Sequence, residues 1–174
     1  MQLSTRARRA IAAARTALSM QPDLPVANDA LQYAFVSKGM RDEHLALQRE
    51  HIARDPELVA AFEQGLSEAN YEGAIRSIAD LRAARYEKSG GIPDTGSSWD
   101  YDPVVGIAKR YLSAGDYDRA IEWLEKAFVV RDPNLPYISF QPIYDPLRSD
   151  PRFQDLLRRM NLPTSSTGAE DHSS

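Results

Sequence analysis

The sequence predicts an all-α fold. Apolar residues recur at spacings of three and four along most of the chain, which is the pattern of amphipathic helices. Ala, Leu, Arg and Glu are plentiful, whereas Val, Ile and Thr are modest in number, and this balance favours helix over sheet. Asp-Pro steps, in which Asp can cap free N–H groups and Pro has no N–H to leave unpaired, predict the beginnings of helices or turns. They stand at Asp55-Pro56, Asp102-Pro103, Asp132-Pro133, Asp145-Pro146 and Asp150-Pro151.

The clearest segment is residues 101–133, which predicts two helices joined by a tight turn. Asp102-Pro103 begins the first helix, Gly115 suits the left-handed residue that ends it, and Asp116 can cap the second. Each helix carries one apolar stripe, and the small residues in the second stripe let a neighbouring helix pack closely. The two stripes are Val104, Ile107, Ala108, Tyr111 and Leu112, then Ala120, Ile121, Leu124, Ala127 and Phe128.

This pattern resembles the tetratricopeptide repeat, in which small, aromatic, Gly, small, large and small residues follow one another in that order. The matching residues are Ala108, Tyr111, Gly115, Ala120, Leu124 and Ala127. Residues 100–163 are also similar to the end-of-group module that finishes many bacterial arrays of this repeat. The resemblance implies a right-handed α-α superhelix of about 3.5 degenerate hairpins with a C-terminal capping helix, over residues 1–163.

Residues 1–22 predict one helix ending before Pro22. Four arginines and no acidic residue lie in this segment, so an Arg-rich presequence is one interpretation. The other is the second helix of a repeat, with Ala10 and Ala17 at its small positions and with Pro22 34 residues before Pro56, the length of one repeat. That helix then exposes a face without a partner helix. Either the chain is the end of a longer protein, or it forms a homodimer through this helix.

Residues 23–56 predict the second hairpin, with its turn at Gly39 and apolar stripes formed by Ala30, Leu31, Ala34, Phe35, Leu45 and Ile52. His44 and His51 occupy positions where the repeat wants small residues. Seven residues apart on one helix, they stand about 10 Å apart along its axis, too far to share one metal ion. We therefore expect either a loosened groove with partly solvated imidazoles or a contact between His44 and a neighbour. The alternative is a small α-helical enzyme or metal-dependent regulator that uses the two histidines.

The rest of the chain predicts a third hairpin, a loop and a cap. Residues 57–88 form the hairpin, with Ala69 at the position of Gly115 in the clearest segment. Residues 87–99, with Gly90-Gly91 and Pro93, read as a long loop. Asp145-Pro146 and Asp150-Pro151 then begin two more helices, and the last one caps the stack. Residues 164–174 are polar and aperiodic, so we expect a disordered tail.

Composition and motifs exclude several classes of function. The formal net charge of −4, with 25 acidic and 21 basic residues, argues against a general nucleic-acid or membrane-surface binder. The absence of Cys excludes disulfides and thiolate metal sites and is compatible with a cytoplasmic location. No apolar run approaches a membrane span, and the sequence lacks the G-x-S-x-G and H-E-x-x-H motifs. We expect no catalytic residue, no cofactor and no metal.

The resemblance also implies where a ligand would bind, because tetratricopeptide arrays hold peptides in a concave groove lined by the first helix of each pair. The expected function is a non-enzymatic module for protein or peptide binding or for self-association, such as the accessory part of a bacterial regulator. The corresponding positions are Val26, Asp29, Tyr33, Val36 and Ser37, then Asp102, Val105, Lys109, Leu112 and Ser113.

Overall fold

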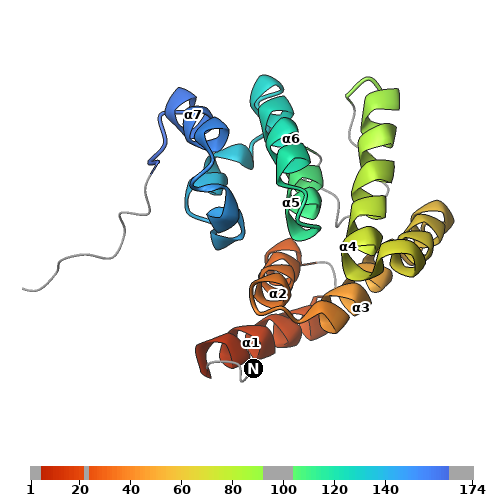
Figure 1. Ribbon diagram of the computed structural model, residues 1–174. Coiled ribbons are helices and arrows are strands. Elements are labelled where there is room, and N and C mark those ends of the chain that lie inside the picture. The colour runs from red at the N-terminus through yellow and green to blue at the C-terminus, as the bar shows by residue number, and fades with distance from the viewer. Residues whose placement is uncertain (1–4, 22–23, 92–103, 165–174) are drawn as a thin grey trace, which may run out of the picture. The chain divides into compact units, whose positions relative to one another are not determined.

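A computed structural model of the chain describes residues 5–21, 24–91 and 104–164 (Figure 1). These residues form helices and no strand, which confirms the all-α prediction. Two compact units divide the chain, Met1–Pro103 and Val104–Ser174, and each is described by itself. The helices are α1 (Thr5–Met20), α2 (Pro25–Ser37), α3 (Arg41–Ile52) and α4 (Pro56–Lys88), then α5 (Val105–Ser113), α6 (Tyr117–Val129), the short 3₁₀ helices η1 (Leu135–Ser139) and η2 (Pro142–Leu147), and α7 (Pro151–Arg159).

In the first unit each helix packs against the next along the chain, α1 on α2, α2 on α3 and α3 on α4. The predicted turn at Gly39 is confirmed, because this glycine has a φ of +63° between α2 and α3. The apolar stripes meet in two buried clusters, so helix-period patterning decides which faces lie inside. One cluster joins α1, α2 and α3 through Ile11, Ala14, Ala27, Leu31, Ala34, Phe35 and Leu47, and the other joins α3 and α4 through Ile52, Leu58, Phe62, Ala74 and Ile78.

Helix α4 is a hairpin of two helices, because the backbone leaves the helical region at Ala69 and Asn70. The turn predicted at Ala69 is therefore confirmed. Asn70 has φ 54° and ψ −140°, a conformation that suits glycine far better than a residue with a Cβ. The two arms cross closely where Gly65 meets Gly73, since a Cβ on either glycine would collide with the carbonyl of the other. Arg85 ties the open end of the hairpin by pairing with Asp55.

Replacing Asn70 by glycine should raise the free energy of unfolding by about 1 kcal/mol. Relief of the positive-φ strain, about 1–3 kcal/mol, exceeds the extra conformational entropy that glycine loses on folding, about 0.5–1 kcal/mol. Urea denaturation of Asn70→Gly beside wild type measures this difference. Asn70→Ala, which keeps the Cβ without the local hydrogen bonding of Asn, should be less stable than wild type. A glycine variant weaker than wild type would contradict the strained turn.

Asp55 both caps α4 and closes the hairpin. Its carboxylate accepts hydrogen bonds from the backbone N–H groups of Glu57, at 3.1 Å, and Leu58, at 3.0 Å, so the predicted helix beginning is confirmed. The Arg85 guanidinium pairs with the same carboxylate and with Glu57. The hydrogen bond from Arg85 is the main cause that lowers the pKa of Asp55 to about 2, with the N-cap hydrogen bonds adding to it.

The stabilisation from Asp55 should disappear in acid. Because the folded pKa of about 2 lies below the ordinary aspartate value, about 3.9, the contribution is full above about pH 4 and is lost as the pH falls towards 2. Asp55→Asn keeps a good N-cap but removes the charge. The difference in free energy of unfolding between wild type and Asp55→Asn, measured from neutral pH to about pH 2, should shrink over that window. A difference independent of pH would mean that the ion pair adds nothing.

In the second unit α5 and α6 form the predicted hairpin. Gly115 has a φ of +74°, and the N–H groups of Gly115 and Asp116 donate to the carbonyls of Leu112, at 3.0 Å, and Tyr111, at 2.9 Å. Asp116 accepts from the Arg119 N–H at 3.3 Å, which confirms the predicted cap. These bonds satisfy the free groups at the two facing helix ends.

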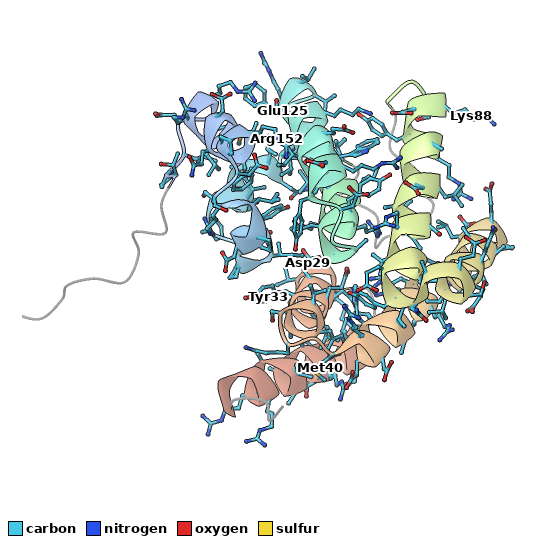
Figure 2. The ribbon with its side chains drawn as sticks, in the orientation of Figure 1. Asp29, Tyr33, Met40, Lys88, Glu125 and Arg152 are labelled. Atoms are coloured by element: carbon cyan, nitrogen blue, oxygen red, sulfur yellow. The ribbon has the colours of Figure 1, made fainter. Side chains whose placement is uncertain are left out.

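Helix α7 packs on α6, and Asp150 caps it by accepting from the Arg152 N–H at 2.8 Å, as predicted. Ion pairs join the two helices: Arg152 with Asp118 at 2.7 Å, and Arg159 with Glu125. The labels in Figure 2 mark Glu125 on α6 and Arg152 on α7. The largest fully buried side chains of this unit are Tyr111, Leu124, Ile138, Tyr144, Leu147, Phe153, Leu156 and Leu157.

Two predictions of detail were wrong. Asp145-Pro146 does not begin a helix, because η2 already begins at Pro142, whose fixed φ suits a first helical position; Asp145 pairs instead with Arg148 at 2.7 Å. The loop predicted over residues 87–99 overlaps α4, which extends to Lys88, and residues 92–99 lie outside the described residues. Asp132-Pro133 does mark a turn, in which Asp132 accepts from the Asn134 N–H at 2.9 Å. Pro22, Pro93, Asp102-Pro103 and the tail from residue 165 lie outside the described residues.

Candidate functional site

The outer side of α2 carries the first set of predicted groove residues. Because their spacings are three and four, they share one side of the helix. Val26 is 76% exposed, and the opposite side of α2 is buried in the first cluster. Figure 2 marks Asp29 and Tyr33 on α2. We call this side the α2 outer face; it consists of Val26, Asp29 and Ser37, which are exposed, and Tyr33 and Val36, which are half-buried.

The second predicted set, on α5, presents little surface. Val105 and Leu112 are 1% and 6% exposed, so neither can contact a ligand in this structure. Lys109 and Ser113 are half-buried, and the Ser113 hydroxyl donates to the Lys109 carbonyl at 2.9 Å. Asp102 lies outside the described residues. Helix α5 buries most of its circumference, which apolar spacing on a nine-residue helix does not reveal in advance. The α2 outer face is therefore the part of the predicted groove that is accessible.

His44 belongs to a buried polar chain that links α2, α3 and α4. Its Nδ1 lies 2.8 Å from the Tyr71 hydroxyl, and its Nε2 lies 3.1 Å from the amide nitrogen of Gln48. That amide also donates to Gln32 Oε1 at 3.3 Å. A donor at Nε2 places the ring proton on Nδ1, which then donates to Tyr71. The expectation of a partly solvated imidazole was wrong for His44, which is 2% exposed. The alternative, a contact between His44 and a neighbour, is confirmed, because Tyr71 and Gln48 close around the ring.

Tyr71 is held as a neutral phenol. Burial is the main cause that raises its pKa to about 12, against a smaller opposite effect from Arg41. The Arg41 guanidinium lies 5.0 Å from the centre of the Tyr71 ring and pairs with Glu72 at 2.5 Å. The chain of hydrogen bonds from Gln32 through Gln48 and His44 to Tyr71 therefore orders three helices.

His51 has different partners from those of His44. Its Nε2 lies 3.2 Å from Asn28 Oδ1, and Asn28 donates to the Leu24 carbonyl at 3.3 Å. Within residues 5–21, 24–91 and 104–164, no three His, Cys, Asp or Glu side chains form a group that could hold a metal ion. Gln32, Gln48 and Asn28 were missed in the sequence. Their signal was weak, because a Gln four residues after His44 is also an ordinary surface residue of a helix.

Comparisons with known proteins find no match to a family model, to a curated protein or to a solved structure. Among the helices that the structure describes, none is both long and apolar enough to cross a membrane.

Removing the Tyr71 hydroxyl should lower the free energy of unfolding by about 1–3 kcal/mol, because Tyr71→Phe leaves a buried His44 N–H without its acceptor. The His44→Leu/Tyr71→Phe double variant should lose less than the sum of the two single variants, since it removes both ends of the bond. Urea denaturation of all four proteins measures the coupling. The exposed Tyr137→Phe is the matched control and should change stability by less than about 0.5 kcal/mol. Additive losses would show that the bond contributes nothing.

Proposed function

We propose that this protein is a non-enzymatic helical-repeat module that binds a protein or peptide. The α2 outer face is the observation that supports the proposal. It combines a strongly exposed valine with a tyrosine and a carboxylate on one side of a helix whose other side is packed. Partially exposed aromatic and apolar side chains beside polar groups are typical of the centre of protein-binding surfaces. The resemblance to the tetratricopeptide repeat implies the same use for the first helix of a pair.

The contacts of the two histidines favour a binding module over an enzyme. Each imidazole contacts groups that hold it in place, namely Tyr71 and Gln48 for His44 and Asn28 for His51. Removal of either should therefore affect stability before it affects any ligand. The proposal extends to an accessory role in a bacterial regulatory protein, as the end-of-group resemblance implies.

Site-specific cross-linking tests the α2 outer face. A photoreactive phenylalanine analogue replaces Tyr33 in the full chain, which is irradiated in cells and analysed by mass spectrometry for cross-linked peptides. The expected result is a small set of partner proteins whose recovery falls several-fold when Val26→Glu is added. The same analogue at Tyr137, an exposed tyrosine of the second unit, is the matched control. Recovery of the same proteins from both positions, or no effect of Val26→Glu, would overturn the assignment.

A further inference from the structure

The outer side of α1 is basic and contains no acidic residue. Arg8, Arg9 and Arg15 are exposed, with Ala12 and Ala13 exposed between them. Arg8 and Arg15 are seven residues apart, so they lie on one side of the helix about 10 Å apart along its axis. The opposite side, with Ile11 and Ala14, is buried against α2. We call Arg8, Arg9, Ala12, Ala13 and Arg15 the α1 basic face.

The arginines of the α1 basic face differ from most other arginines of the described chain, which form ion pairs with carboxylates. Arg41, Arg49, Arg85, Arg148, Arg152, Arg158 and Arg159 all form ion pairs. Within the described residues, the arginines of the α1 basic face form none; Arg15 makes one contact of another kind, with its guanidinium 6.0 Å from the centre of the Phe35 ring. Helices α3, α4, α6 and α7 carry charges of both signs, as a polar outer face that serves solubility does.

Three other occupants fit this face poorly. An isologous dimer would set the arginines of one copy against those of the other, which repel. A bilayer-bound amphipathic helix inserts its apolar side, but that side of α1 is already buried against α2. Nucleic acid finds no aromatic side chain on this face for its bases to stack on.

We propose that the α1 basic face binds an acidic helical segment of a partner protein. Carboxylates spaced three, four and seven residues apart on such a helix would lie opposite Arg8, Arg9 and Arg15, and the small Ala12 and Ala13 side chains allow the two helices to approach closely. This inference rests on the proposed function and specifies the chemistry of the partner. Charge pairs of this exposed kind chiefly set the association rate and its dependence on salt.

Fluorescence anisotropy with labelled poly-L-glutamate tests the proposal on the full chain. The triple variant Arg8→Glu, Arg9→Glu and Arg15→Glu should bind this probe at least about tenfold more weakly than wild type at low salt, and added salt should weaken the wild-type complex. The matched control reverses three other exposed cations, Arg54, Lys88 and Arg131, and so changes the net charge by the same amount. The control should keep most of the affinity. Circular dichroism of both variants checks that they remain helical.

Labelled duplex DNA and phosphatidylserine vesicles are measured beside poly-L-glutamate. Equal losses in the α1 variant and the control, or no binding by wild type, would overturn the proposal. Tighter α1-dependent binding to DNA or to vesicles would overturn it in favour of that anion. The cross-linking at Tyr33 is independent of these measurements: its failure with a positive anisotropy result rejects only the α2 outer face, and the reverse result rejects only the acidic partner at α1.

Discussion

The reversal of the chain at Asn70 is the constraint on which the first unit depends. It turns one continuous stretch of sequence into two antiparallel arms, and Gly65 and Gly73 let those arms touch backbone to backbone. The second arm then carries Tyr71 to His44, and brings Arg85 to Asp55. Without that reversal Asp55 and Arg85, 30 residues apart in sequence, would lie at opposite ends of one straight helix. A residue with a Cβ is held in a glycine-like conformation at the turn because contacts on both arms compensate for its strain.

Polar and apolar contacts play different parts in this unit. The two apolar clusters supply the favourable burial that holds the helices together. The buried chain of hydrogen bonds from Gln32 through Gln48 and His44 to Tyr71 fixes how the helices are aligned along one another, because each donor must meet its acceptor. A shift of one residue along α3 would leave these groups buried and unpaired, at a cost of about 1–3 kcal/mol each. The histidines are thus explained by the order they impose on three helices.

The accessible surfaces that remain are chemically distinct. The α2 outer face mixes apolar, aromatic and acidic groups, whereas the α1 basic face carries one sign of charge over small side chains. The first suits a short-range, desolvated contact, and the second suits long-range attraction that guides a charged segment into place.

Periodicity and capping chemistry determined the helices, because those signals are local. Asp55, Asp116 and Asp150 cap where the sequence says they should, and Gly39 and Gly115 take the positive φ expected of them. The local signal was ambiguous at Asp145-Pro146, because Pro142 and Pro146 can each stand at the first position of a helical turn. The helix η2 begins at Pro142. Burial was decided only by the tertiary structure. Periodicity shows that a helix has an apolar side, but it cannot show how much of the circumference its neighbours cover. Val105 was therefore predicted at a surface and lies inside, whereas the burial of Leu112 agrees with its place in the apolar stripe. The partners of His44 could likewise not be read from the sequence, because the Tyr71 hydroxyl lies 27 residues away and reaches the imidazole only when α3 and α4 pack together.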